Sequence, residues 1–273
     1  PKIWVIRFDK KDSPTVYRFF IMSRNLTFDR SWDLAYYSEG IVGKTNQRSN
    51  IPVVDFIKYL KDHSDFRASD RFIADLHKVK FFTHFDHMVF HPIGIPKYKN
   101  PLPIDCSKLL IISPFVDDKS LEKFKSESTG KRYLFSRKEE LNKLHPDSLD
   151  GFQTYSFSDK IVDGEDFFDE GSEFETSPQN LHAKLFIAEN VGNYKWFLGS
   201  ANCTLAALDR NNEFLVQLTS NDNKFSIDSI KRILLGTESG REYFEEYSPE
   251  DGNVEKEPSY EQEIRIFIHN LFQ

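Results

Sequence analysis

Alternating apolar and polar positions at the start of the chain predict paired β-strands. Residues 2–8 and 17–23 are rich in aromatic and β-branched side chains, and the segment 9–14 between them has the charged, serine and proline composition typical of a turn. These three segments predict a β-hairpin. Further strands are expected over 34–37 and, from its aromatic content, over 80–90.

Helical spacing of apolar residues appears between these expected strands. The segment 53–63 has apolar residues on one helical face and is predicted to be a helix. A second helix is expected over 69–79, with Ser69 or Asp70 as its N-cap. The proline-rich stretch 92–103 is the expected linker between the two halves of the chain.

Strands and helices alternate after this linker. The expected elements, in order, are a strand over 109–115, a helix over 119–126, a strand over 133–135, a helix over 137–144 and a strand over 151–157. A second hairpin is expected from the apolar segments 181–187 and 195–202. This alternation predicts an α/β fold in which helices cover a sheet.

The second hairpin repeats the first in sequence. Each copy runs through a lysine, an apolar strand, a turn, an apolar strand, Ser-x-Asn, a short polar segment and a carboxylate. The aligned pairs are Lys2 with Lys184, Ser23 with Ser200, Asn25 with Asn202, and Asp33 with Glu213. His182 stands two positions before Lys184, and its counterpart in the first copy is the position that precedes Pro1.

These residue types have the chemistry to bind and attack a phosphodiester. Histidine supplies a nucleophile or a general acid near neutral pH, lysine a compact cation for the non-bridging oxygens, and asparagine a neutral donor as charge develops. In a continuous strand, His182 and Lys184 would share one face, as would Ser200 and Asn202. Burying such groups unpaired among apolar neighbours costs free energy, which favours a functional site over a structural histidine.

The pattern resembles the signature of the phospholipase D superfamily, in which His-x-Lys followed by Gly/Ser-Ser-x-Asn occurs twice. The segments His182-Ala183-Lys184 and Gly199-Ser200-Ala201-Asn202 match one copy, and Lys2 with Ser23-Arg24-Asn25 matches the other except for its histidine. In the superfamily an acidic residue stands five positions after the lysine. That position is occupied by Glu189 in one copy and by Arg7 in the other. Loss of that aspartate looks more like the tyrosyl-DNA phosphodiesterase branch and some bacterial relatives.

The resemblance implies a bilobal α-β-α sandwich of two pseudo-two-fold related halves, with mixed sheets flanked by helices. The halves would be residues 1–103 and 104–240, followed over 241–273 by an acidic connector and the start of a C-terminal helix. The segment 104–180 before His182 has no counterpart before Pro1. We therefore expect the parent chain to extend upstream and to place a histidine before Pro1.

The resemblance also implies roles for the site residues. The upstream histidine would attack phosphorus to form a phosphohistidine, and His182 would protonate the leaving oxygen. Glu213 and its counterpart Asp33 would orient a catalytic histidine, with an N-cap or a surface ion pair as the equal alternative for Asp33. The residues expected to bind the substrate are Lys2, Lys184, Asn25 and Asn202, with Ser23, Ser200, Arg24 and Arg30 beside them. Plain solvent exposure is the alternative for the two arginines.

The retained asparagines favour a nucleic-acid substrate over a lipid. The leading hypothesis is a metal-independent nuclease of bacterial defence or repair, with nucleic acid and a helicase or further domains of a longer parent as partners. The alternatives are a phospholipase or phosphatidyltransferase, and an inactive module that binds phosphate or nucleic acid. No cofactor is expected. The residues His84, Asp86, His87 and His91 are explained more simply as strand surface and loop than as a metal site.

Composition sets limits on these hypotheses. The 273 residues carry a net charge of −7, which disfavours holding nucleic acid by bulk electrostatics but is compatible with a local basic site. Cys106 and Cys203 have no metal-binding spacing and are typical of reduced thiols in a cytoplasmic protein. No apolar run is long enough to span a membrane. The acidic stretch 163–175 is expected to be a solvated loop, with a flap over the site as the alternative.

Overall fold

A four-stranded antiparallel sheet forms the N-terminal part of the computed structural model, which describes residues 2–24, 31–158, 161, 180–237, 240 and 242–248. Its strands are β1 (Ile3–Phe8), β2 (Val16–Met22), β4 (Ala35–Val42) and β5 (Val79–Phe81), in the order β1-β2-β4-β5. Alternation along β2 buries Tyr17, Phe19 and Ile21 on one face, as the two-residue period of a strand requires. The predicted hairpin is confirmed, and the strand expected over 34–37 continues to Val42.

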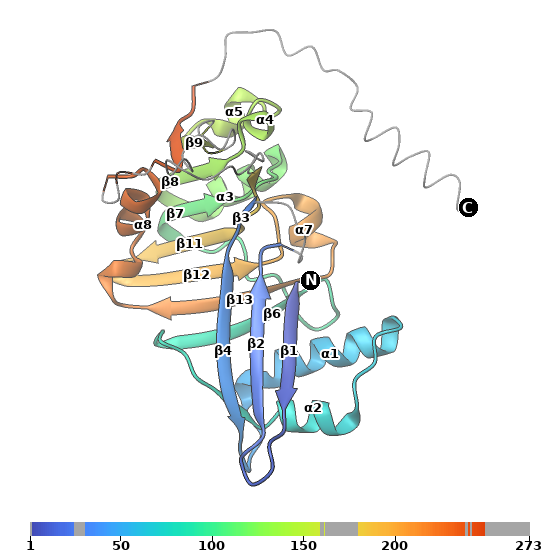
Figure 1. Cartoon of the computed structure of the whole chain (residues 1–273). Coiled ribbons are helices and arrows are strands. Elements are labelled where there is room, and N and C mark those ends of the chain that lie inside the picture. The colour runs from blue at the N-terminus through green and yellow to red at the C-terminus, as the bar shows by residue number, and fades with distance from the viewer. Residues whose placement is uncertain are drawn as a thin grey trace, which may run out of the picture.

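An eight-stranded mixed sheet makes up most of the rest of the molecule (Figure 1). Its strands, in spatial order, are β14 (Phe244–Glu246), β9 (Phe152–Phe157), β8 (Ser128–Ser136), β7 (Cys106–Ile112), β11 (Leu185–Asn190), β12 (Asn193–Gly199), β13 (Glu213–Ser220) and β6 (His87–Ile93). The strands β7, β8 and β9 run parallel to one another, and every other neighbouring pair is antiparallel. A short parallel pair of β3 (Ser31–Trp32) and β10 (Asn180–Leu181) forms a third sheet.

Helices flank both large sheets. They are α1 (Ile51–His63), α2 (Asp70–Leu76), α3 (Asp118–Glu127), α4 (Lys138–Leu141), α5 (Pro146–Leu149), α7 (Leu205–Asp209) and α8 (Ile227–Leu234), with 3₁₀ turns over Arg48–Asn50 and Asn223–Phe225. The apolar face of α1 packs where the two sheets meet, and Phe56 lies 5.0 Å from Phe214 between ring centroids. Phe19 and Phe90, one from each sheet, lie 4.8 Å apart in the same way. The expected α/β fold with sheets flanked by helices is therefore confirmed.

The structure corrects several expected boundaries. The strand expected over 80–90 is two strands, because the chain turns between β5 and β6. The helix expected over 69–79 ends at Leu76, although Ser69 caps it as predicted by accepting a hydrogen bond from Phe72 N. The stretch 92–103 is not all linker, since β6 runs through Pro92 to Ile93. Proline is tolerated there because β6 is an edge strand of the sheet.

The internal repeat is present in the structure as two three-stranded meanders with the same register. With Lys2 aligned to Lys184, the pairs Ile3–Ile21 and Ile21–Tyr36 of β1, β2 and β4 correspond to the pairs Leu185–Leu198 and Leu198–Val216 of β11, β12 and β13. The backbone therefore repeats residue by residue over three strands. The division of the chain at residue 103 stays a prediction, and β6, which precedes that boundary, pairs with β13 of the larger sheet.

The outer faces of the two meanders differ in their cover. Phe186 of β11 is fully buried, and its ring stacks on Phe124 of α3 with centroids 5.5 Å apart. Its counterpart Trp4 is 47% exposed in the described part of the chain. The other large hydrophobic side chains exposed on that face of the four-stranded sheet, among the described residues, are Phe8, Tyr37 and Ile41.

Three features expected from the sequence lie outside the described residues. They are Asn25 with Arg30, the acidic stretch 163–175, and the segment 241–273 apart from residues 242–248. Within the part of the chain that the structure describes, no helix is both long and apolar enough to cross a bilayer.

Candidate active site

The candidate site lies on the side of the eight-stranded sheet where the parallel strands have their carboxyl ends. The parallel strands β7, β8 and β9 end on this side, the antiparallel β11 begins there, and β12 ends there. The end of β2 from the other meander meets the end of β12 at the same place (Figure 1). A Cβ atom on Gly199 would lie 2.1 Å from the Phe214 carbonyl oxygen and 2.9 Å from Ile21 Cδ1, so only glycine allows this approach.

The segment that carries the signature histidine is not a continuous strand. Residues 182–184 connect β10 to β11, and the backbone N–H groups of His182 and Ala183 both donate to the carbonyl oxygen of Trp32, at 2.8 and 3.0 Å. The expectation that His182 and Lys184 belong to one unbroken strand is therefore wrong, and a shared face of their side chains stays a prediction. The same contact holds His182 next to the segment that carries Asp33 of the other copy.

Lys184 is a buried cation at the centre of the site. Its side chain is 2% exposed, and Nζ donates to the His182 carbonyl oxygen at 3.0 Å. Burial, together with the positive charge of Lys2, lowers the pKa of Lys184 to about 7. The groups that influence Lys184 electrostatically, and therefore lie near it, are Lys2, Glu213, Arg137 and Asp33.

Lys2 comes from the other copy and faces the same region. Its Nζ donates to the Ser23 carbonyl oxygen at 3.1 Å. Burial lowers the pKa of Lys2, and the carboxylate of Glu213 opposes that effect. Two desolvated ammonium groups repel each other, so an anion bound between them would reduce a repulsion that Glu213 only partly offsets.

The signature serines perform the same backbone role in both copies. Ser200 Oγ donates to the Glu213 carboxylate and accepts a hydrogen bond from Phe214 N at 3.1 Å. Ser23 Oγ accepts from Leu34 N, the counterpart of Phe214 N, at 2.9 Å. Both serines are buried and fix the start of the strand that follows the carboxylate. Direct contact of these hydroxyls with substrate stays a prediction.

The two carboxylates have different partners. Glu213 is held by Ser200, whereas Asp33 pairs with Arg24 at 2.9 Å between Oδ2 and Nε. The surface ion pair that was the alternative for Asp33 is therefore present. It also gives Arg24 a partner within its own copy, so contact of Arg24 with substrate stays a prediction.

Asn202 follows β12 in a segment fixed by its neighbours. The next residue, Cys203, donates its N–H to Ser113 Oγ at 2.9 Å and accepts from Asp117 N at 3.1 Å. Asn202 Oδ1 is buried and has no hydrogen-bond partner among the described residues. Buried polar atoms are nearly always paired, so this oxygen is a candidate to accept a hydrogen bond from a group that binds in the site, while donation to an anion would come from the amide nitrogen.

Two residues near the site were missed by sequence reasoning. Arg137 follows the end of β8 and lies close enough to Lys184 to lower its pKa, and Phe115 follows the end of β7. Neither belongs to the repeat. The signal that could have found them is the parallel order of β7 and β8, whose carboxyl ends bring the following residues to one edge.

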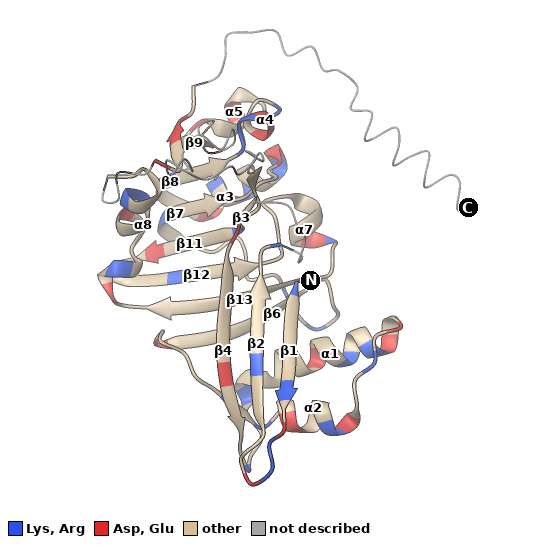
Figure 2. Cartoon of the chain, viewed as in Figure 1, with Lys and Arg blue, Asp and Glu red and all other residues tan. Residues whose placement is uncertain are grey.

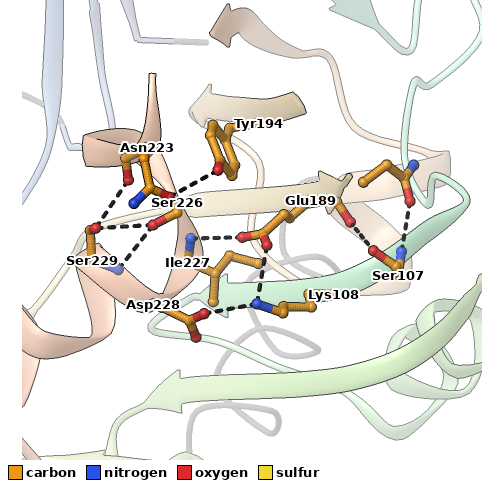
Figure 3. A network of polar contacts seen from close by, with 10 residues as sticks. Ser107, Lys108, Glu189, Tyr194, Asn223, Ser226, Ile227, Asp228 and Ser229 are labelled. Atoms are coloured by element: carbon orange, nitrogen blue, oxygen red, sulfur yellow. Dashed lines mark hydrogen bonds and ion pairs between the residues drawn. The ribbon is translucent and has the colours of Figure 1, made fainter. Parts of the chain in front are cut away.

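The acidic residue of the signature has a structural role in this chain. Glu189 lies at the far end of β11 from Lys184, where its carboxylate pairs with Lys108 at 3.1 Å and accepts a hydrogen bond from Ile227 N at 3.0 Å (Figure 3). Asp228 pairs with the same lysine at 2.8 Å. These contacts fasten the beginning of α8 to the sheet.

Basic and acidic residues are mixed over the surface of the described elements. Figure 2 shows basic and acidic residues interspersed over the described elements rather than gathered in one stripe. In the same described ranges no group of three or more metal-binding side chains occurs. Two residues of the histidine-rich cluster have structural contacts, since His91 Nε2 lies 3.0 Å from Gln217 Oε1 and Asp86 accepts from Asn221 N at 3.0 Å.

No protein-family model and no curated protein matches the sequence. Several solved structures are similar to the chain, three of which are described below. Phosphatidylserine synthase of Haemophilus influenzae has a TM-score of 0.48 and 8% identity, over 94% of this chain and 66% of that chain. Polyphosphate kinase of Porphyromonas gingivalis has a TM-score of 0.46 and 10% identity, over 86% and 32%.

The third is a mutant of the yeast tyrosyl-DNA phosphodiesterase, with a TM-score of 0.41 and 10% identity, over 78% of this chain and 66% of that chain. The present chain thus spans less than two thirds of the length of each of these proteins. A likeness at this level defines no activity, and the function has to be inferred from the residues of the site.

Proposed function

We propose that this chain carries the active site of a phospholipase D-like, metal-independent phosphodiesterase that cleaves nucleic-acid phosphodiesters through a phosphohistidine. The observation that carries the proposal is the approach of two copies of one motif. Lys2 and Lys184 occupy equivalent positions in two meanders of identical register, and each lies near the other and near Glu213.

The paired lysines are the proposed phosphate-binding groups. A phosphodiester carries one negative charge, and an anion between two ammonium groups stabilises both. Because the pKa of Lys184 is about 7, this residue is only partly protonated in the free protein near neutral pH. Substrate binding would favour its charged form, and the Asn202 amide would donate to the same phosphate as charge develops in the transition state.

The proposed reaction has two displacements at phosphorus. In the first, a histidine nitrogen forms a bond to phosphorus while the bond to the leaving oxygen breaks, and His182 gives that oxygen a proton. In the second, water attacks phosphorus, His182 takes the water's proton, and the nitrogen–phosphorus bond breaks. The attacking histidine is proposed to stand immediately before Pro1, the position equivalent to His182 in the repeat.

The carboxylates are the proposed positioning residues. Asp33 lies next to Trp32, whose carbonyl oxygen accepts from His182 N, so this carboxylate belongs to the surroundings of His182. Glu213, by the symmetry of the repeat, would serve the histidine of the other copy. A nearby carboxylate fixes the imidazole tautomer and stabilises the imidazolium that forms during catalysis.

A phosphodiesterase assay run with and without excess EDTA tests the proposal. The full-length parent, its His182→Ala variant and a His84→Ala control would be compared on single- and double-stranded DNA, RNA and phosphatidylcholine vesicles. His84 is an exposed histidine outside the site, so its loss should leave turnover unchanged. Cleavage of nucleic acid that disappears only in His182→Ala is the expected result.

Three other outcomes would contradict the proposal in different ways. Turnover of vesicles alone would indicate a phospholipase. Phosphate binding without turnover would indicate a binding module. Turnover that EDTA abolishes would exclude the metal-independent mechanism. A helicase or further domains of a longer parent, as partners of a nuclease, remain predictions that the assay does not address.

A further inference from the structure

An exposed aromatic side chain stands on a hydrogen-bonded loop next to the segment that carries Asn202. Phe115 is 40% exposed and lies in the loop that follows β7. Ser113 Oγ donates to the Phe115 carbonyl oxygen at 2.7 Å and accepts from Cys203 N, next to Asn202. Leu205 N donates to Asp117 at 2.7 Å, at the other end of the loop. The loop is therefore bonded on both sides to the segment that carries Asn202.

A cation holds the ring in place. The guanidinium carbon of Arg137 lies 4.3 Å from the centroid of the Phe115 ring, and its Nε donates to the Pro114 carbonyl oxygen at 2.9 Å. Arg137 also pairs with Glu140 at 3.4 Å. The charge of Arg137 also lowers the pKa of Lys184, so the arginine contacts the aromatic ring and lies within electrostatic range of that lysine.

Exposure of a single phenylalanine is common on protein surfaces and usually has no function. This case differs in two respects. Hydrogen bonds fix the loop backbone at Pro114 and Phe115, and a cation–π contact with Arg137 orients the exposed ring. The ring also stands next to cations that bind anions, and nucleotides combine an anion with a flat aromatic group.

We infer that Phe115 is a base-stacking residue, and that together with Arg137 it forms a subsite for the nucleobase next to the scissile phosphate. The inference rests on the proposed function and deepens it. Every base offers a π-face, so stacking on an aromatic side chain is tolerant of sequence. Bases within a duplex are already stacked on their neighbours, so the subsite selects single-stranded DNA or RNA and gives no advantage to a lipid.

The test compares two oligonucleotides of equal length and charge. One carries bases throughout, and the other has abasic residues on both sides of the central phosphate. Affinity would be measured by fluorescence anisotropy in EDTA with full-length protein carrying His182→Ala, which prevents cleavage. Into this background Phe115→Ala, Phe115→Trp and, as a matched control, Phe82→Ala would be introduced. Phe82 is 63% exposed and lies in the turn between β5 and β6.

The expected result is a change in the preference for the base-bearing oligonucleotide. Phe115→Ala should lower the ratio of the two affinities by about 5- to 150-fold, the range typical of one stacked base. Phe115→Trp should retain the ratio, since it keeps a stacking face, and Phe82→Ala should leave it unchanged. An unaltered ratio in Phe115→Ala, or no binding of either oligonucleotide, would overturn the inference. Because binding is measured without cleavage, a failed phosphodiesterase assay does not decide this result.

Discussion

Replacing Lys184 with methionine should make the protein more stable below neutral pH. The lysine is almost fully buried, and burial together with Lys2 lowers its pKa from 10.5 to about 7. Below pH 7 both the folded and the unfolded chain carry the proton, so the folded state bears the whole cost of the buried ammonium. Between about pH 7 and 10.5 the unfolded chain binds more protons, so the free energy of unfolding rises with pH.

The size of this effect follows from the two pKa values. The interval from about 7 to 10.5, at 1.36 kcal/mol per pH unit, gives roughly 5 kcal/mol as an upper bound. Lys184→Met keeps the length of the side chain and removes the charge. The variant should therefore gain up to roughly 5 kcal/mol of unfolding free energy at pH 6, and the gain should shrink toward pH 10.

Urea denaturation followed by circular dichroism at pH 6, 7, 8 and 9 would measure this gain. The exposed Lys80 provides a matched control, because Lys80→Met removes the same charge without relieving any burial. A variant that is less stable than the natural protein at pH 6 would refute the reasoning. That outcome would mean that Glu213 and Asp33 stabilise the ammonium by more than its burial costs.

Three further predictions address proton linkage and the scaffold. Binding of inorganic phosphate at pH 8 should be accompanied by proton uptake, because the anion favours protonated Lys184; calorimetry in buffers of different ionisation enthalpy measures this, and proton release would contradict it. Ser200→Ala should lower the unfolding free energy by about 1–3 kcal/mol in urea denaturation, since Phe214 N loses its acceptor; an unchanged midpoint would exclude that role. Glu189→Ala should cost a similar amount, about 1–3 kcal/mol, yet leave turnover intact, and a loss of turnover would place Glu189 in the mechanism.

Elements with a local signal in the sequence were predictable. The first hairpin, α1 and the Ser69 cap of α2 follow from alternation, helical spacing and capping chemistry within short segments. The repeat was also predictable, and it identified Lys2 and Lys184 as equivalent candidates. Two equivalent lysines on equivalent strands face one region because the two meanders meet end to end.

Features that depend on distant segments were not predictable. The strand is interrupted at His182, where two successive N–H groups donate to the carbonyl oxygen of Trp32, a residue far away in the sequence. The pairing of β6 with β13 depends on β13 having a free side in the sheet, which the sequence does not reveal. Pro92 within β6 also disfavours a strand at this position. Arg137 and Phe115 reach the site through the order of parallel strands, which a linear pattern does not reveal.

The common register of the two meanders means that this polypeptide contains its own controls. Trp4 and Phe186 occupy the same place in equivalent strands and pair with equivalent neighbours, but among the described elements only Phe186 is covered by a helix. The same substitution made at both positions would meet the same backbone in two surroundings. The difference between the two effects would separate the energetic contribution of tertiary cover from the intrinsic preference of a residue for a β-strand, without recourse to a second protein.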